Sequence, residues 1–199
     1  MSKILETKKV AKNGIEVTLL SPPVAAGGEI LEVVKGIMRK SEHLLTEQDE
    51  LTFTAQDEEE MIRAYTEHPD KVIIVPKVAG KIIGMMDFRC GLRRRISHQG
   101  EFGMSIEPAF QGLGIGRMML DELVKWATGN PRIETLRLSV HAKNVRAIAL
   151  YRSAGFSEEG RQLNGVRLGK ASYDDVIAMA RSVKSPGPYL AMPPPGDDK

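Results

Sequence analysis

The chain has 199 residues, of which 42% are apolar and 27% charged, and its 28 basic and 26 acidic residues leave a formal charge of +2. This composition is typical of a globular protein with a core, and it excludes a disordered or collagen-like chain. The balanced charge provides no overall attraction for nucleic acid, and no apolar run approaches the roughly 18–20 residues of a membrane helix. We therefore expect neither nucleic acid nor a membrane as a partner.

The length and the cysteine content indicate one domain in a reducing compartment. The length lies at the upper end of the usual range for one domain and the sequence has no internal repeat, so we expect a single domain over residues 1–184. Residues 185–199 contain five prolines and are expected to form a flexible tail. Cys90 is the only cysteine and the first twelve residues are too charged for a signal peptide, which favours the cytoplasm.

The first part of the chain is expected to form one strand and two helices. Residues 14–20 are rich in β-formers and end at Pro22 and Pro23, which cannot continue a ladder of hydrogen bonds. Apolar residues at three- and four-residue spacing predict a helix over residues 28–41. A second helix is predicted over residues 54–67, where Thr54 and Asp57 form a capping pattern.

The rest of the chain alternates between strands and helices. Three strands, at residues 71–78, 81–89 and 99–106, are expected to form an antiparallel meander that begins with a hairpin at Ala79-Gly80. They are followed by a helix from Leu113 to Gly129, a strand at 133–140, a short helix capped by Asn144, and two strands within 158–183. The strand, helix and strand of residues 99–140 form a crossover unit, which favours parallel pairing of its two strands.

Three glycines, Gly112, Gly114 and Gly116, lie between a predicted strand and a predicted helix. Their bare backbone amides can converge on an anion, and the helix N-terminus adds a favourable dipole. A dinucleotide fingerprint would need glycine where the chain has Arg117 or Met119, and a P-loop would need a Gly-Lys-Ser/Thr ending that is missing. The glycines therefore predict a phosphate-binding turn of another kind.

This turn and a later segment together resemble the GNAT superfamily of acyl-CoA-dependent N-acyltransferases. The family signature Gln/Arg-x-x-Gly-x-Gly/Ala is matched by Gln111, Gly114 and Gly116, directly after a strand. The segment that begins at Asn144, carries Tyr151 and closes in Gly-Phe is similar to the family's second cofactor-binding segment. The resemblance covers residues 14–181.

The resemblance implies a fold and a set of cofactor contacts. The fold is α/β, with a mixed, mostly antiparallel sheet that is splayed between its fourth and fifth strands and flanked by about four helices. Acetyl-CoA would lie in the splay, with its pantetheine arm along the main chain of the fourth strand. The implied contacts are Met104, Ser105, Ile106, Gln111, Gly112, Leu113, Gly114, Ile115, Gly116, Arg117, Asn144 and Tyr151. Residues 173–179 further resemble members that acylate amino acids or protein N-termini.

Transfer to an amine requires a base and a proton donor. An alkyl or α-amino group is mostly protonated at neutral pH, so it must lose a proton before it attacks a thioester. Glu101 is the first candidate base because it lies on the strand that leads to the predicted cleft, Glu107 is the second, and His98 or a water relay could assist. The resemblance assigns Tyr151 as the donor to the leaving thiolate. Cys90 has no recognisable base beside it, so direct attack in a ternary complex is favoured over an acyl-enzyme.

Two functions follow from these residues. The first is an acetyltransferase that uses acetyl-CoA and acts on a primary amine in a small molecule, an amino acid or a protein N-terminus. The second is a non-catalytic acyl-CoA-binding or regulatory module, which would need the turn but neither Tyr151 nor a carboxylate. No metal is expected, because the sequence lacks a spaced set of His and Cys ligands. His141 is expected at the surface at the end of a strand, with a position facing the substrate as the alternative. A homodimer is among the oligomeric states left open.

Overall fold

The computed structural model describes residues 3–41, 46 and 50–184, so the predicted tail at 185–199 lies outside the described residues. The described strands form one sheet in the order β1-β2-β3-β5-β6-β7-β9-β8, with β4 paired to β3 alone. They are β1 (Thr7–Val10), β2 (Glu16–Leu20), β3 (Lys71–Val78), β4 (Lys81–Ile82), β5 (Gly84–Cys90), β6 (Gln99–Ile106), β7 (Thr135–His141), β8 (Ser157–Gly169) and β9 (Ser172–Ser182). Every neighbouring pair is antiparallel except β6 and β7, which are parallel.

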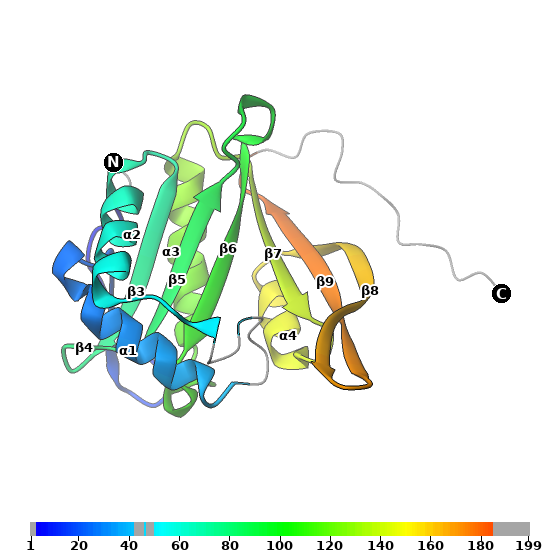
Figure 1. Ribbon diagram of the computed structural model, residues 1–199. Helices are drawn as coiled ribbons and strands as arrows, with labels where there is room; N and C mark the ends of the chain where they lie inside the picture. The colour runs from blue at the N-terminus through cyan, green and yellow to red at the C-terminus, as the bar shows by residue number, and fades with distance from the viewer. Residues whose placement is uncertain (1–2, 42–45, 47–49, 185–199) are drawn as a thin grey trace.

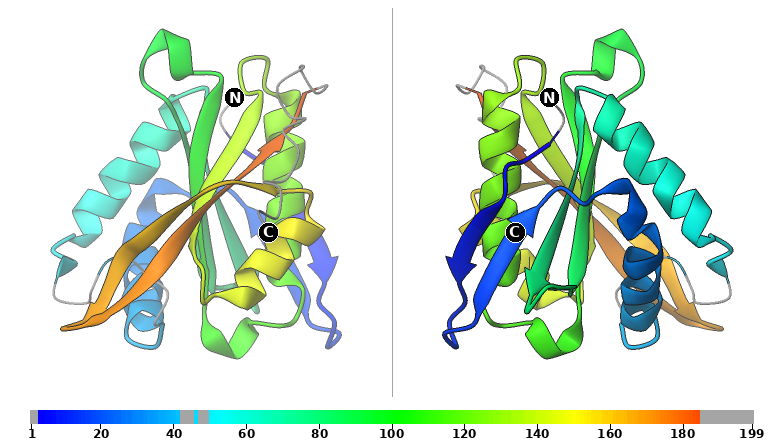
Figure 2. Two further views of the ribbon diagram at one scale, coloured as in Figure 1. Left: turned by 90° about the vertical axis from the view of Figure 1, so that its right-hand side faces the viewer. Right: turned by 90° about the vertical axis from the view of Figure 1, so that its left-hand side faces the viewer.

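Four α-helices cover the two faces of the sheet in the described part of the chain. α1 (Gly27–Met38) and α2 (Ala55–Glu67) lie on one face, and α3 (Ile115–Gly129) and α4 (Val145–Ser153) lie on the other (Figures 1 and 2). The α/β class, the mostly antiparallel sheet and the four flanking helices confirm the expected fold. Within the described residues, no helix combines the length and the apolar composition needed to cross a membrane.

The sheet separates two apolar cores. The larger core lies under α3 and α4 and includes Phe88, Phe102 and Tyr151, while the smaller one packs Ile62 and Tyr65 of α2 against the opposite face. Alternation along each strand explains the division, because successive side chains of a strand point to opposite faces. Each side chain of β5 and β6 therefore points to one face of the sheet or the other, which decides which side chains can reach a site on the α1 and α2 face.

The local signals in the sequence place most elements correctly. Thr54 and Asp57 form the predicted capping box at the start of α2, where the Asp57 N–H donates to the Thr54 hydroxyl at 3.2 Å and the Thr54 N–H donates to the Asp57 carboxylate at 2.7 Å. The meander of β3, β5 and β6 is also present, as is the parallel pairing of β6 and β7. The predicted strand at 81–89 is divided into β4 and β5, because the Ile83 N–H turns to the Pro76 carbonyl at 3.0 Å.

One strand was not predicted. β1 precedes the first predicted strand and pairs with β2 along the edge of the sheet. Its inward residue Lys9 forms an ion pair with Glu122 of α3 at 2.9 Å, so a charged side chain occupies a position where the pattern expects an apolar one. Lysine is a common residue on edge strands, where it opposes pairing with other chains.

Candidate active site

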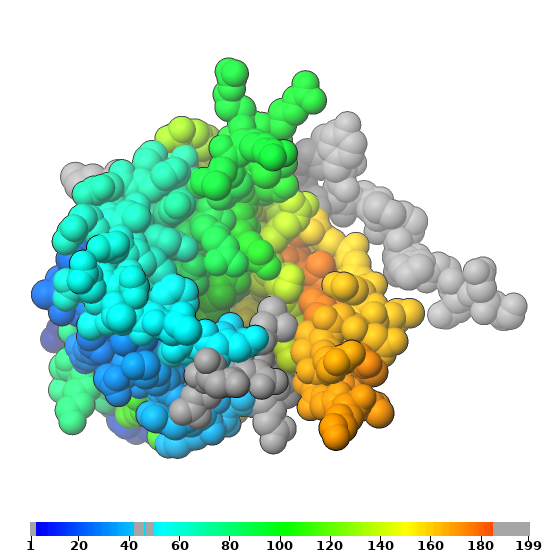
Figure 3. Space-filling model, viewed as in Figure 1, coloured from blue at the N-terminus to red at the C-terminus, as the bar shows by residue number. Residues whose placement is uncertain are grey.

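The sheet opens between β6 and β7. These strands pair over only three positions, from Gln99 opposite Thr135 to Glu101 opposite Arg137, and they diverge beyond Glu101. The following part of β6 remains paired with β5 alone, which leaves the backbone edge of Met104 to Ile106 open toward β7. The space-filling view is hollowed between the green residues of β6 and the orange hairpin of β8 and β9 (Figure 3). This divergence is the splay expected between the fourth and fifth predicted strands.

The glycine turn lies at the end of β6 where the strands are separated. Gly112 and Gly114 have φ angles of 83° and 88°, in the left-handed region that favours glycine. The Gln111 side chain stabilises the approach to the turn, since its Nε2 donates to the Ile106 carbonyl at 2.9 Å. On the other side, the Leu113 carbonyl accepts a bond from the Lys12 N–H at 3.0 Å. The turn is thus fixed to both the end of β6 and the β1–β2 connection.

The N-terminus of α3 emerges from this turn without a side-chain cap. Gly114 is its N-cap residue, no side chain bonds there, and the first turn of the helix carries no acidic residue. The Met118 N–H bonds to the Gly114 carbonyl at 3.1 Å, so the amides of Ile115, Gly116 and Arg117 have no intrahelical acceptor. A row of unpaired amides at the positive end of a helix dipole suits the pyrophosphate of an acyl-CoA.

Two basic side chains approach the glycines, and the sequence analysis did not identify either one. A Cβ built on Gly112 would lie 3.3 Å from Arg146 Nη2, and one built on Gly114 would lie 3.7 Å from Lys12 Cγ. Arg146 also donates to the Gln111 side chain at 3.3 Å. Arg117, one of the contacts that the resemblance implies, bonds to Asp121 at 2.8 Å and to the Ser153 carbonyl at 3.1 Å, the latter at the end of α4.

Gly116 and Ile115 contribute to the site through packing and backbone. A Cβ on Gly116 would lie 3.1 Å from Leu150 Cδ2 and 3.4 Å from Met104 Cε, so the missing side chain allows α3 to pack closely on α4 and β6. Ile115 is 1% exposed, and its side chain belongs to the larger core. Only its amide therefore remains for a ligand.

The second predicted segment lies beside the diverging strands. Asn144 caps α4 as expected, since its Oδ1 accepts the Ala147 N–H at 3.1 Å. Tyr151 is buried, and its ring makes edge contacts with Phe102 and Phe156 at centroid distances of 6.0 Å. Burial raises the pKa of Tyr151 to about 12, so the phenol stays protonated at physiological pH. Its hydroxyl makes no hydrogen bond within the described part of the chain.

Glu101 lies at the vertex of the opening and is exposed. Its neighbours across the strands are Arg89 on β5 and Arg137 on β7. Arg137 is held by Glu159 through contacts of 2.7 and 3.0 Å, so the charge of this arginine is already compensated. The Glu101 carboxylate forms no ion pair with another described residue.

The other candidate bases lie elsewhere along β6. Glu107 follows the opposite end of the strand, about 20 Å from Glu101 at the usual rise per residue, and its N–H donates to the Ile83 carbonyl at 2.9 Å. His98 precedes the strand, and its carbonyl accepts the N–H groups of Glu134 and Thr135 at 2.7 and 3.2 Å. The structure therefore does not bring the three candidates together, and Glu101 is the one at the vertex.

The structure places two further groups of polar residues where the sequence did not predict them. His141 is buried rather than at the surface, being 4% exposed beside Asp174, with Nδ1 3.8 Å from Oδ2. His68, Asp70 and Cys90 offer ligand atoms within 4.8 Å of one another, a grouping that their separation in the sequence conceals. Both oxygens of the Asp70 carboxylate are bound, one by Arg132 at 3.0 Å and the other by Asn130 at 3.2 Å. These contacts indicate a structural role for Asp70, because they connect the turn before β3 to the segment after α3.

Comparison with known proteins establishes the family. The model of the Acetyltransferase (GNAT) family matches residues 41–156, which is more than half of the chain. The protein therefore belongs to the GNAT acetyltransferase family. Among solved structures, a GNAT-family acetyltransferase from Streptococcus pneumoniae superimposes with a TM-score of 0.81 at 21% identity, over 84% of this chain and 99% of that one. The putative acetyltransferase yncA from Salmonella typhimurium, solved with acetyl-CoA, has a TM-score of 0.76 at 17% identity, over 88% and 99%.

Three of the curated relatives are N-acetyltransferases. An L-amino acid N-acetyltransferase of Escherichia coli is 26% identical over 54% of this chain and 66% of its own length. The [ribosomal protein bS18]-alanine N-acetyltransferase of Salmonella typhimurium is 38% identical over 40% and 52%. The N-alpha-acetyltransferase RimI of Mycobacterium tuberculosis is 37% identical over 42% and 48%. The matches thus span between about half and two thirds of these relatives' lengths.

Proposed function

We propose that the protein transfers an acetyl group from acetyl-CoA to a primary amine by direct attack in a ternary complex. The observation that carries this proposal is the uncapped N-terminus of α3, which follows the left-handed glycines and lies at the open end of the gap between β6 and β7. It is supported by the curated relatives, whose names describe transfer to amino acids and to protein N-termini.

Three parts of the chain are suited to hold the co-substrate. The free edge of β6 at Met104, Ser105 and Ile106 offers backbone groups to the amides of a pantetheine arm. The unpaired amides at the start of α3 suit the pyrophosphate, and Lys12 and Arg146 add positive charge on either side of the turn. Asn144 keeps its Nδ2 available, because the cap of α4 uses only Oδ1.

The chemical step requires a proton acceptor and stabilisation of a thiolate. Acetyl-CoA supplies the thioester, whose C–S bond breaks as the amine nitrogen bonds to the carbonyl carbon. Glu101, directly or through a water, takes one proton from the ammonium before the attack, and the second proton that nitrogen loses as the amide forms reaches the CoA thiolate through solvent. The Tyr151 hydroxyl donates a hydrogen bond to the departing sulfur. Complete transfer from a phenol with a pKa of about 12 to a thiolate with a pKa of about 8.5 is uphill, so we assign Tyr151 the role of a hydrogen-bond donor.

Release of free CoA thiol from acetyl-CoA, measured across a panel of amines, amino acids and short peptides, tests this proposal. Calorimetry with CoA provides a separate measurement of cofactor binding. We expect both binding and acceptor-dependent thiol release. A folded protein that binds CoA and acetylates none of these acceptors would instead be a non-catalytic acyl-CoA-binding module, and one that does not bind CoA would overturn the assignment of the turn.

A further inference from the structure

The face of the sheet beneath α1 and α2 carries carboxylates that the proposed chemistry does not explain. Phe88 and Phe102 enter the core under α3, and alternation along β5 and β6 therefore turns Asp87 and Glu101 to the opposite face. Asp87 is paired with Gly103, two positions beyond Glu101 on β6. Residues in this diagonal relationship lie about 7–8 Å apart, so the carboxylates of Asp87 and Glu101 are neighbours on this face of the sheet.

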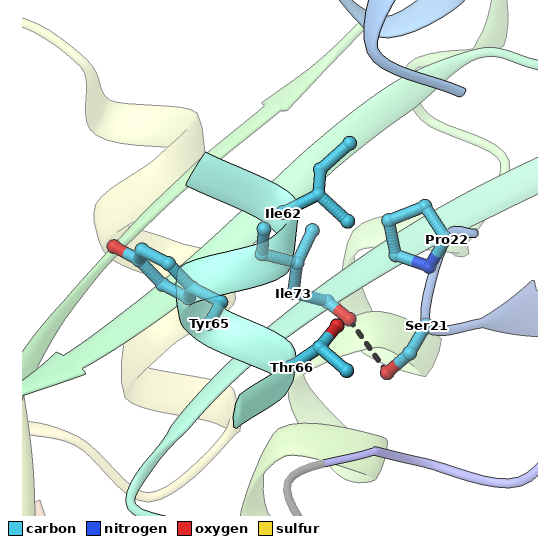
Figure 4. Close-up of a pocket in the computed structure, with 6 residues that line it drawn as sticks. All are labelled: Ser21, Pro22, Ile62, Tyr65, Thr66 and Ile73. Carbon is cyan, nitrogen blue, oxygen red and sulfur yellow. Dashed lines mark hydrogen bonds between the residues drawn. The ribbon is translucent and has the colours of Figure 1, made fainter. Parts of the chain in front are cut away.

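A third carboxylate reaches this region from α2. Glu58, Ile62 and Tyr65 form the buried side of the helix, at the spacing that places side chains on one face. The Tyr65 hydroxyl donates to Asp87 Oδ2 at 2.8 Å, which anchors this face of α2 over β5. Figure 4 shows the Tyr65 oxygen turned away from the small gap between α2 and β3, a gap with room for little more than a water molecule. The Tyr65 hydroxyl therefore binds Asp87 and does not line that gap (Figure 4).

Among the described residues, Glu58 has no partner of opposite charge. It is 8% exposed, and its Oε2 is fully buried without a hydrogen-bond partner in the described residues. Burial, and then the negative charges of Asp87 and Asp57, raise the pKa of its carboxyl. A buried carboxylate is costly unless a cation or donors compensate it, so this position favours the arrival of a positive group.

The described residues leave the position beside Gly103 open. Gly103 has no side chain, and a Cβ built there would meet only Asp87 Oδ1, at 3.4 Å. Two basic residues approach Asp87 and Tyr65 on this face: Arg89, opposite Glu101, lowers the pKa of Asp87 through its charge, and Lys71 Nζ is 5.4 Å from the Tyr65 ring centroid. Arg137 is bound by Glu159. Among the described residues, the charges that act on Glu58 are those of Asp87 and Asp57, and both are negative.

We propose that the acceptor carries two ammonium groups, one that is acetylated beside Glu101 and a second that is held between the carboxylates of Glu58 and Asp87. This inference rests on the proposed function, because it identifies the acceptor of the same site. Tyr65 is a positioning residue, since it acts by fixing the Asp87 carboxylate. The separation of Asp87 and Glu101 suits a chain of about five carbons between the two nitrogens.

Calorimetry with the full-length protein saturated with CoA tests the second charge directly. Pentane-1,5-diamine and pentylamine have the same chain and differ in one ammonium group, and 5-aminopentanoate replaces that ammonium with a carboxylate. We expect the diamine to bind at least about tenfold more tightly than pentylamine, and 5-aminopentanoate to bind least tightly. Equal affinities for the two amines, or the tightest binding for 5-aminopentanoate, would overturn the proposal.

Conservative variants identify the residues that cause the preference for the diamine over pentylamine. Glu58→Gln and Asp87→Asn should reduce the preference for the diamine to less than about threefold while pentylamine binding changes little. Glu60→Gln, on the exposed side of the same helix, is the matched control and should retain the full preference. If Asp87→Asn does not fold, Gly103→Ala provides a second test, because its methyl group would narrow the space beside Asp87 Oδ1 and should weaken diamine binding selectively. An unchanged preference in Glu58→Gln contradicts the proposal.

Two further measurements separate this inference from the proposed function. Thiol release with either amine tests acetyl transfer, whereas the binding measurements do not depend on turnover. Transfer without a charge preference would overturn this inference and leave the proposed function standing. Diamine binding that depends on Glu58, without transfer to any amine, would overturn the proposed function, and the carboxylates would then form a diamine-binding site with no acetylated nitrogen. A peptide amide with lysine as its second residue, compared with its norleucine analogue, distinguishes a peptide acceptor from a free diamine.

Discussion

Glu101 and Arg137 are the last facing residues of β6 and β7 before the two strands diverge. Because Arg137 is bound to Glu159 through two contacts, the pair marks the vertex of the opening without neutralising Glu101. The carboxylate that we assign as the base therefore lies at the point where a thioester along β6 and an acceptor from the α2 face would meet.

Replacing Glu101 with Gln should lower kcat at neutral pH by about 100-fold, since a positioned base typically contributes a factor of this size. Part of the loss should be recovered at about pH 9–10, where more of the amine is deprotonated in solution. The pH dependence of thiol release measures both effects. Glu107→Gln, beyond the far end of the strand, provides the comparison, and the opposite ranking of the two variants would move the base to Glu107.

Tyr151→Phe should lower kcat by about tenfold to 100-fold with little change in the Kd for acetyl-CoA. The variant removes the hydroxyl that we expect to bond the leaving sulfur, but it keeps the ring that packs on Phe102 and Phe156. Thermal unfolding should show that its stability is preserved. A wild-type rate with a competent acceptor would remove Tyr151 from the chemical step.

Gly114→Ala should weaken CoA binding by about tenfold. Its φ of 88° costs an alanine about 1–2 kcal/mol, so the turn that presents the α3 amides is expected to relax. Gly129→Ala at the other end of α3 is a matched control, since a Cβ there meets nothing within 4 Å and its φ is not positive. Calorimetry on both variants decides whether the effect belongs to the turn, and equal affinities would contradict its role.

Lys12→Gln and Arg146→Gln should each raise the Kd for CoA, by about tenfold at low salt and by less at high salt, because exposed charges are screened. Arg117→Gln should have a smaller effect, since that guanidinium is already bound to Asp121 and to the Ser153 carbonyl. Titrations at two ionic strengths provide the measurement. A larger loss for Arg117→Gln would show that Arg117 contributes more to phosphate binding than Lys12 and Arg146.

Local signals in the sequence predict the parts of the site that depend on neighbouring residues. The capping box of α2, the glycine turn and the Asn144 cap all use residues within a few positions of one another. Lys12 could not be found this way, because it reaches Gly114 from the β1–β2 connection. β1 was missed because its inward lysine pairs with α3 and breaks the apolar alternation.

The proximity of Glu58 and Asp87 could not be predicted from the sequence for a similar reason. Glu58 and Asp87 are 29 residues apart in the printed sequence and come from a helix and a strand. Each looks like an ordinary polar residue in its own segment. Only the packing of α2 on β5, fixed by the bond from Tyr65 to Asp87, shows that Glu58 is buried beside another acid.

Glu58→Gln should stabilise the folded protein at neutral pH. Burial and neighbouring charges raise the pKa of Glu58 above its ordinary value of about 4.3. There is therefore a pH window, between the pKa of the unfolded state and the higher pKa of the folded state, in which the folded protein keeps a proton that the unfolded chain has released. Stability therefore decreases with rising pH across the window, and an amide, which cannot ionise, avoids the loss. We expect a gain on the order of 1 kcal/mol at neutral pH, or roughly 3 °C in Tm, which disappears below about pH 4. Thermal unfolding of wild type, Glu58→Gln and the exposed control Glu60→Gln across this range measures it. A Tm difference that is independent of pH, or one that Glu60→Gln shares, would show that the effect does not come from a buried charge at position 58.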